Sequence, residues 1–245
     1  MRLLTTTTNA PQLKEFASNP EVEYAILSHR WREEEVTLQD LMRPDVDTMK
    51  GFAKLKGACA IAQGLGFEYL WMDTCCIDKT SSAELSEAIN SMYMWYRRAA
   101  VCLAYLDDIS GAGFQAIGKS IWFTRGWTLQ ELIAPEEVIF YNSYWKVQGT
   151  RTNRVSELES ITGISKEVLL TRDMKNISVA QKMHWMSYRH TTRVEDQAYC
   201  LLGIFGINMP TIYGEGMNAF LRLQEEIIKR SDDQSIFAWG SRVSV

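Results

Sequence analysis

Short apolar runs alternate with amphipathic helical patterns over the first 145 residues or so of this 245-residue chain. The strand-like runs lie at residues 23–28, 69–72, 101–106 and 138–141. Between them, apolar residues recur at three- and four-residue spacing at 50–63 and again from Leu85 to Trp95, after a capping-box pattern formed by Ser81 and Glu84. This alternation predicts an α/β fold in which helices flank a parallel sheet.

The pattern changes at about residue 149, where one helical segment begins to follow another. Helices are expected at 179–189, 194–205 and 217–230, and a short strand at 235–239. No low-complexity linker separates the two patterns. We therefore expect residues 1–148 to form the α/β portion and residues 149–245 a mainly helical extension of the same domain.

The charge distribution argues against a nucleic-acid or membrane partner. The net charge is −4 and the basic residues are scattered, so the chain lacks the basic patch that binds a polyanion. The N-terminus lacks the apolar core of a signal peptide, and the most apolar later run, Tyr199 to Pro210, is too short to cross a bilayer. We expect a soluble, cytoplasmic protein with no membrane span.

The sequence also lacks the common cofactor and metal motifs. Five cysteines without CxxC spacing and three dispersed histidines indicate neither a disulfide scaffold nor a local metal site. Four of the cysteines lie in apolar stretches, as reduced core thiols commonly do. The sequence has no GxGxxG after a strand, no GxxxxGK[ST], no GxSxG and no HExxH. No metal and no bound nucleotide cofactor are therefore expected.

Polar and aromatic residues gather in the loops that follow the predicted strands. In open parallel sheets, ligands bind beyond the carboxyl ends of the strands, so these loops form the expected site. The candidates are Ser28, His29, Arg30 and Trp31 after the first strand, Asp73 after the second, and Trp122, Arg125, Trp127 and Glu131 after the third. Glu131 has a second interpretation, because Thr128-x-x-Glu131 fits a capping box in which the carboxylate only satisfies a backbone N–H.

Six segments together resemble the fungal heterokaryon incompatibility (HET) domain. They are YAILSHRW at 24–31, WMDTCCIDK at 71–79, ELSEAINSMYMWY at 84–96, WFTRGWTLQELIAP at 122–135, RVEDQAYCLLGIF at 193–205 and YGEG at 213–216. HET domains are in turn similar to Toll/interleukin-1 receptor (TIR) domains, which have a flavodoxin-like parallel sheet. Residues 127–132, WTLQEL, resemble the TIR pattern W-C-x-x-E-L, with Thr128 in place of the cysteine.

The resemblance implies an enzyme that cleaves NAD. Active TIR domains use the glutamate of that pattern, which corresponds to Glu131, and they require self-association. The implied role is regulated cell death in heterokaryon incompatibility and fungal innate immunity, with NAD as substrate and no cofactor. One carboxylate can suffice because nicotinamide leaves a positively charged pyridinium as a neutral group and needs no general acid.

Each neighbour of Glu131 has a substrate-binding and a structural interpretation. Three tryptophans, Trp31, Trp122 and Trp127, offer flat surfaces for a nicotinamide or adenine ring but also suit a core. Two arginines, Arg30 and Arg125, suit a pyrophosphate, or else ion pairs with Asp73 or Asp78. Asp73 can bind a ligand hydroxyl or cap its own loop. The TIR parallel places Ser28 and His29 in the pocket, where His29 can contact a ligand ring or have a structural role.

A non-enzymatic module that recruits other death-signalling proteins is the alternative function, with Glu131 only a helix cap. In the helical half, a charged cluster of Arg189, Arg193, Glu195 and Asp196 and the turn at 213–216 are expected to brace the sheet portion or form an assembly surface, without touching substrate. Family members often carry a further region beyond the domain, so the resemblance leaves open whether the full protein extends beyond residue 245.

Overall fold

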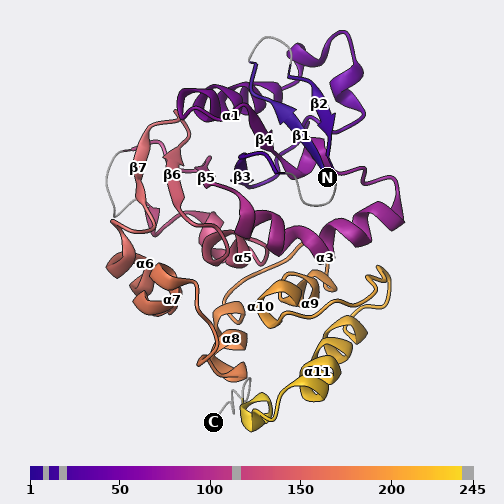
Figure 1. Ribbon diagram of the computed structural model, residues 1–245, viewed down its shortest axis with the longest axis vertical. Helices are drawn as coiled ribbons and strands as arrows, with labels where there is room; N and C mark the ends of the chain where they lie inside the picture. The colour runs from indigo at the N-terminus through magenta and orange to yellow at the C-terminus, as the bar shows by residue number, and fades with distance from the viewer. Residues whose placement is uncertain (8–10, 17–20, 112–116, 239–245) are drawn as a thin grey trace.

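A seven-stranded mixed sheet, covered by helices on both faces, forms the centre of the described part of the chain (Figure 1). The computed structural model describes residues 1–7, 11–16, 21–111 and 117–238. The strands are β1 (Arg2–Thr5), β2 (Leu13–Glu15), β3 (Ala25–His29), β4 (Tyr69–Trp71), β5 (Val101–Leu106), β6 (Val138–Asn142) and β7 (Val147–Thr150). Their order across the sheet is β2-β1-β4-β3-β5-β6-β7. The prediction of an α/β fold is confirmed.

The sheet is parallel only in its middle. Strands β4, β3, β5 and β6 run parallel, whereas β1 and β2 at one edge and β7 at the other are antiparallel to their neighbours. The predicted parallel sheet is therefore confirmed for its four middle strands, whereas the antiparallel strands at both edges were not predicted. The parallel strands are buried and read as continuous apolar runs, while the edge strands are short, partly exposed and polar, so they carry a weak sequence signal.

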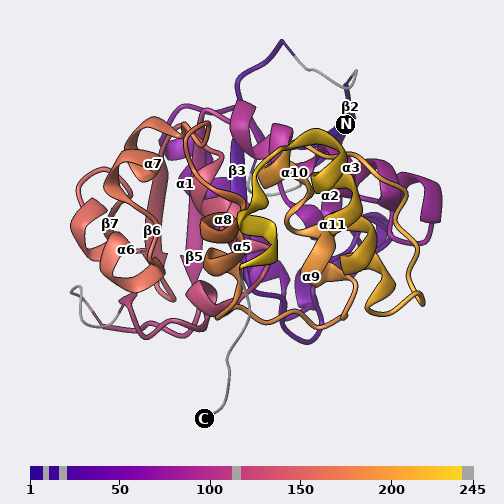
Figure 2. The same cartoon turned by 90° about the horizontal axis from the view of Figure 1, so that it is seen from below.

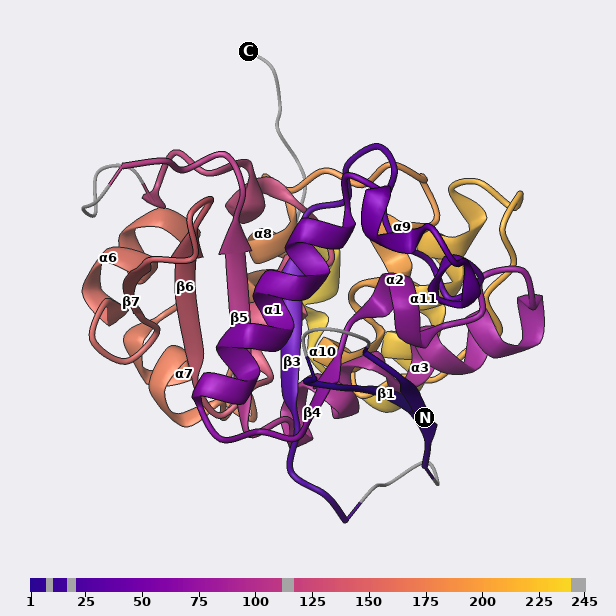
Figure 3. The same cartoon turned by 90° about the horizontal axis from the view of Figure 1, so that it is seen from above.

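Helix α1 (Phe52–Gly64) crosses one face of the sheet (Figure 3), and α3 (Ser82–Arg98) and α5 (Thr128–Ile133) cover the other face (Figure 1). The predicted start of α3 is confirmed in part. The Ser81 hydroxyl accepts the Glu84 N–H, but the Glu84 carboxylate binds Arg2 and the Asp78 N–H instead of completing a capping box. This contact ties the N-terminal strand to the helix.

The C-terminal half packs below α3 and α5, where Figure 2 shows its helices in front of the sheet. These helices are α6 (Val155–Thr162), α7 (Lys166–Thr171), α8 (Val179–Met186), α9 (Asp196–Tyr199), α10 (Leu202–Phe205) and α11 (Asn218–Arg230). The single helix expected at 194–205 is thus two short helices. The prediction of a strand at 235–239 was wrong for residues 235–238. Gln234–Phe237 form a 3-10 helix that Asp233 caps, and residue 239 lies outside the described residues.

The two halves are joined by buried polar contacts. Strand β7 crosses the expected boundary at residue 148, and the buried Arg151 just after it donates to the carbonyls of Leu132, Ile133 and Glu136 at the end of α5. The sheet portion therefore continues to Thr150, and the C-terminal half is fastened to the helix that carries Glu131.

The five cysteines are buried and free, as expected of core thiols. Among the described residues, helices long and apolar enough to span a bilayer do not occur.

Candidate active site

A cavity of about 400 Å³ lies between the carboxyl ends of β3 and β4 and the C-terminal half. Its sheet-side wall contains His29, Trp31, Asp73, Ile77, Lys79, Arg125, Trp127, Thr128 and Glu131. Helix α3 contributes Leu85, Ile89, Met92 and Tyr96, and the C-terminal half contributes Thr192, Arg193, Asp196 and Tyr213. The volume falls in the usual range for small-molecule sites, roughly 300–1,000 Å³.

Glu131 lies in α5 and is almost fully buried, with 7% of its surface exposed. The capping box is not formed, because Thr128 is the first residue of α5 and not its N-cap. The Thr128 hydroxyl instead donates to the Trp122 carbonyl at 2.6 Å and accepts the Arg189 guanidinium at 2.8 Å. The Glu131 side chain accordingly faces the cavity wall and not the helix terminus.

A hydrogen-bond chain orients the Glu131 carboxyl group. The indole N–H of Trp122 donates to the Ser28 hydroxyl at 2.7 Å, and Ser28 donates in turn to Glu131 Oε2. Since an indole N–H can only donate, the single Ser28 proton is directed at Glu131. The end of β3 and the loop before α5 thus fix the position of the carboxyl group from behind.

Burial raises the pKa of Glu131 to about 8, and the Ser28 hydrogen bond opposes this rise. Asp73 adds to the rise, while Arg125 and Arg189 act against it. In the empty cavity at neutral pH, Glu131 is therefore mostly protonated. A nearby positive ligand would lower its pKa and favour the carboxylate.

His29, at the end of β3, is neutral and has no hydrogen-bond partner for either ring nitrogen among the described residues. Its Nε2 lies 3.7 Å from Asp73 Oδ1 at the cavity wall. Burial, with a smaller contribution from Lys54, lowers its pKa to about 3. A histidine with so low a pKa is a poor general base at neutral pH but can still exchange hydrogen bonds with a ligand.

Trp31, Asp73 and Lys79 form one connected group at the cavity. The Trp31 indole N–H donates to Asp73 Oδ2 at 2.8 Å, and Lys79 Nζ lies 3.4 Å from the same oxygen. The Lys79 ammonium also sits 3.4 Å from the centroid of the Trp31 ring. Burial alone would raise the pKa of Asp73, but Lys79 and the Trp31 hydrogen bond help to hold it below its usual value. Asp73 is thus an ionised carboxylate.

Three of the expected substrate-binding residues do not line the cavity. Ser28 and Trp122 lie behind Glu131, where the Trp122 ring packs edge-on against Phe123 and Phe140. Arg30 pairs with Asp107 at 3.1 Å, and with neither Asp73 nor Asp78. These three side chains lie behind or beside the residues that line the cavity. The sequence analysis had expected all three to bind substrate.

Arg125 and Trp127 line the cavity from the segment before α5. This segment is held by a β-bridge between Arg125 and His190. The Gly126 N–H donates to the His190 carbonyl at 3.0 Å, and the Arg189 guanidinium donates to the Arg125 carbonyl at 2.8 Å. A Cβ at Gly126 would lie 2.5 Å from Thr191 Cγ2, so a larger residue here would displace the Thr191 side chain. The C-terminal half therefore sets the position of both side chains.

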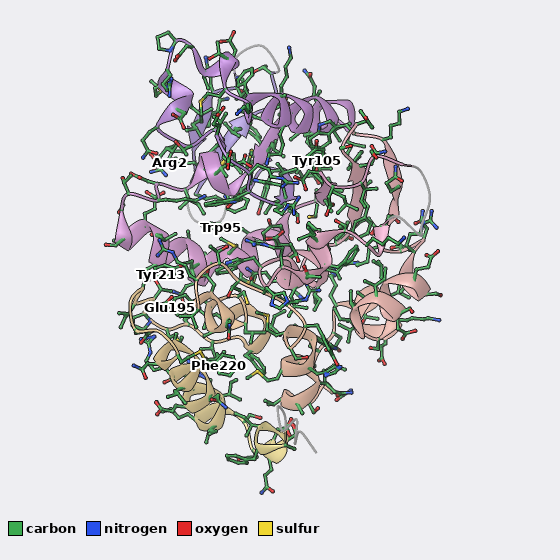
Figure 4. The ribbon with its side chains drawn as sticks, turned by 180° about the vertical axis from the view of Figure 1, so that it is seen from behind. Arg2, Trp95, Tyr105, Glu195, Tyr213 and Phe220 are labelled. Atoms are coloured by element: carbon green, nitrogen blue, oxygen red, sulfur yellow. The ribbon has the colours of Figure 1, made fainter. Side chains whose placement is uncertain are left out.

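The sequence interpretation missed the cavity residues of the C-terminal half. Tyr213 donates to Asp196 Oδ1 at 2.9 Å, and Arg193 Cζ lies 4.3 Å from the centroid of the Tyr213 ring. Figure 4 shows Tyr213 beside Glu195, whose carboxylate accepts the N–H groups of Gly214 and Gly216. Glu195 has the bracing role expected of the cluster, but Arg193 and Asp196 face the cavity. The spacing of these residues in the sequence did not predict that they would line the cavity.

In the part of the chain that the structure describes, His, Cys, Asp and Glu side chains form no group of three that could hold a metal ion. The cavity instead combines the buried protonated carboxyl of Glu131, the carboxyl groups of Asp73 and Asp196, aromatic rings and three cationic side chains, Lys79, Arg125 and Arg193. This arrangement suits an organic ligand that carries both a flat ring and anionic groups.

Comparison with known proteins points to fungal incompatibility proteins. Residues 24–116 match the family described as "Heterokaryon incompatibility protein (HET)", and residues 218–245 match a domain of unknown function, DUF8212. The "Vegetative incompatibility protein HET-E-1" of Podospora anserina is 45% identical over 218 residues, a region that covers 84% of this chain and 16% of that protein. The chain thus spans about a sixth of the length of this relative. No solved structure matches the chain.

Proposed function

We propose that the chain, of which residues 24–116 match the heterokaryon incompatibility family, acts in heterokaryon incompatibility as an NAD nucleosidase that depletes NAD and so causes regulated cell death. Water and NAD would yield nicotinamide, ADP-ribose and a proton. The observation that carries the proposal is the buried Glu131 carboxyl at the wall of a cavity that also presents aromatic and cationic side chains.

The chemistry needs one carboxylate. As the bond between the ribose C1′ and the nicotinamide nitrogen breaks, its electron pair neutralises the pyridinium and positive charge develops on the ribose. A carboxylate in a dry cavity stabilises that charge strongly, because little water screens it. Water then attacks C1′ and releases its proton to Glu131 or to solvent.

The raised pKa of Glu131 is compatible with this role. The pyridinium of NAD carries a positive charge, and its approach favours the ionised form of the carboxyl group. Substrate binding and proton loss from Glu131 would therefore be coupled. The group would be mostly protonated in the empty site at neutral pH and become a carboxylate when the substrate is in place.

The order of the parallel strands supports a TIR-like arrangement. Numbered along the chain, the four parallel strands lie in the order 2-1-3-4, which is the beginning of the flavodoxin-like order, and ligands in such sheets bind where the order reverses. Here the reversal lies between β3 and β5, and the next-to-last residue of β3 is Ser28, which binds Glu131.

The test is nicotinamide release from NAD by the concentrated purified protein. Glu131→Gln should abolish release while retaining the fold, and Glu87→Gln, an exposed glutamate of α3 that does not line the cavity, serves as the matched control. Equal release from the wild type and Glu131→Gln would exclude Glu131 as the catalytic residue. No release from the wild type at any concentration would contradict the nucleosidase.

A recruiting module is the second candidate, favoured by one observation. Met217, Leu221 and Ile228 are about half exposed and lie on or next to α11 at four- and seven-residue spacing, which places them on one face. If toxicity in cells depends on these side chains and is unchanged by Glu131→Gln, the recruiting function replaces the enzymatic one.

A further inference from the structure

Arg193 lies at the cavity, and its position there is not needed to hold the C-terminal half against the sheet. It is exposed, its guanidinium stacks on the Tyr213 ring, and it forms no salt bridge with a carboxylate among the described residues. Tyr213 is itself fixed by its hydrogen bond to Asp196, which is 8% exposed. The guanidinium is therefore held in place while its N–H donors remain available to a ligand.

Arg125 presents a second available guanidinium at the cavity, from the segment before α5. Its backbone is anchored by His190 and Arg189, and its side chain forms no salt bridge in the described part of the chain. The third cation of the cavity, Lys79, is already paired with Asp73 and stacked on Trp31. Two of the three cations thus form no salt bridge among the described residues, although Arg193 interacts at longer range with Glu195 and Asp196 and Arg125 with Glu131.

The charges of the cavity favour an anionic ligand near these two arginines. Lys79, Arg125 and Arg193 bring three positive charges, against which stand the carboxyl groups of Asp73 and Asp196, because Glu131 is mostly protonated in the empty site. A guanidinium binds phosphate oxygens through two parallel hydrogen bonds, which lysine cannot do. The pair is thus suited to a phosphate-bearing ligand.

We propose that Arg193 and Arg125 bind the pyrophosphate of the dinucleotide, so that the C-terminal half takes part in substrate recognition. The inference rests on the proposed function for the identity of the substrate. It also orients the ligand, because the positive pyridinium is repelled by the arginines and attracted to the Asp73 carboxylate. The nicotinamide ribose would then lie towards Glu131 and Asp73, and the phosphates towards the C-terminal half.

Calorimetry of ADP-ribose binding tests this assignment. ADP-ribose carries the pyrophosphate but lacks the ribose–nicotinamide bond that the enzyme would cleave. Arg193→Gln should weaken ADP-ribose binding about tenfold, because it removes a charge-assisted contact to phosphate. Arg193→Lys keeps the positive charge but loses the pair of parallel N–H donors, so its affinity for ADP-ribose should lie between those of the wild type and Arg193→Gln. Arg98→Gln, at an exposed arginine of α3 away from the cavity, is the matched control and should bind as the wild type does.

Cleavage kinetics give a second readout that loss of structure would not mimic. With NAD as substrate, Arg193→Gln should raise KM about tenfold with little change in kcat, because the contact is made equally in the ground and transition states. With nicotinamide riboside, which lacks the phosphates, the variant and the wild type should behave alike.

The outcomes separate this inference from the proposed function. Nicotinamide release by the wild type together with unchanged ADP-ribose binding by Arg193→Gln overturns the arginine site and leaves the nucleosidase intact. Weakened ADP-ribose binding by Arg193→Gln without any nicotinamide release supports the anion site and contradicts the nucleosidase. A wild-type protein that does not bind ADP-ribose overturns the inference.

Discussion

The hydroxyl of Ser28 donates a hydrogen bond to the carboxyl group of Glu131, which lies 103 residues further along the chain. Ser28 is fully buried at the end of β3, and its oxygen already accepts the Trp122 indole N–H. The contact joins the central strand of the sheet to α5 and holds the Glu131 carboxyl group at the cavity wall. It also partly offsets the effect of burial on the pKa of Glu131.

Nicotinamide release should increase with pH. The proposed reaction needs the Glu131 carboxylate, and burial raises the pKa of this group to about 8. We expect kcat/KM, which reports the free enzyme, to fall about tenfold per pH unit below that value and to level off above it. The midpoint of kcat should lie at lower pH, since bound pyridinium stabilises the carboxylate. A rate constant that is flat between about pH 6 and 9 would contradict the assignment.

Ser28→Ala should move this pH profile to higher pH. The substitution removes the one hydrogen bond that Ser28 donates to Glu131, a bond that lowers the carboxyl pKa. It also leaves the buried Trp122 N–H without its acceptor, which costs about 1–3 kcal/mol of stability. The pH profile and the unfolding free energy should be measured together, with Ser82→Ala, at an exposed serine of α3, as the control. An unmoved midpoint would show that Ser28 does not act on Glu131.

Glu131→Gln should become more stable relative to the wild type as the pH rises. The folded protein keeps the Glu131 proton up to about pH 8, whereas the unfolded chain loses it near 4.5. The stability contribution of the protonated group is therefore complete below about pH 4.5 and is lost as the pH rises towards 8, by at most about 1.4 kcal/mol per pH unit. Denaturant unfolding of both proteins at pH 5 and 8 measures the difference, and a difference that does not change with pH would refute the raised pKa.

Gly126→Ala should destabilise the protein by about 1–3 kcal/mol and reduce nicotinamide release. The new methyl group would lie 2.5 Å from Thr191 Cγ2 and 2.9 Å from Met186 Cε, and would push the C-terminal half away from the segment that carries Arg125 and Trp127. Gly64→Ala is the control, since a Cβ there meets no atom within 4 Å and lies in helix α1. Similar melting temperatures for the two variants would argue against a tight junction at Gly126.

Turnover per molecule should increase with protein concentration. As part of the proposed function, we expect the monomer to be weakly active and self-association to complete the site. Nicotinamide release across a hundredfold dilution series, with the oligomeric state followed by light scattering, measures the dependence. A specific activity that stays constant or falls as concentration rises would exclude activation by self-association.

The central architecture followed from local patterns in the sequence. Strands β3, β4, β5 and β6 are mainly apolar runs between helices, because a strand buried on both faces favours apolar side chains along most of its length. Helices α1, α3 and α11 show the 3.6-residue period because each covers a core with one face. The order of these elements was enough to place Glu131, Asp73 and His29 near one edge of the sheet.

Tertiary structure decided which side chains reach the cavity. Ser28, Arg30 and Trp122 are close in sequence to residues that line it, yet they turn towards the core or Asp107, because neighbouring side chains in a loop can point in opposite directions. Arg193, Asp196 and Tyr213 come from the other half of the chain and meet the cavity only through packing. The pKa of Glu131 likewise depends on burial, which no local sequence pattern contains. The sequence by itself determined the elements and the candidate carboxylate, while long-range packing determined the cavity, its charge and its second wall.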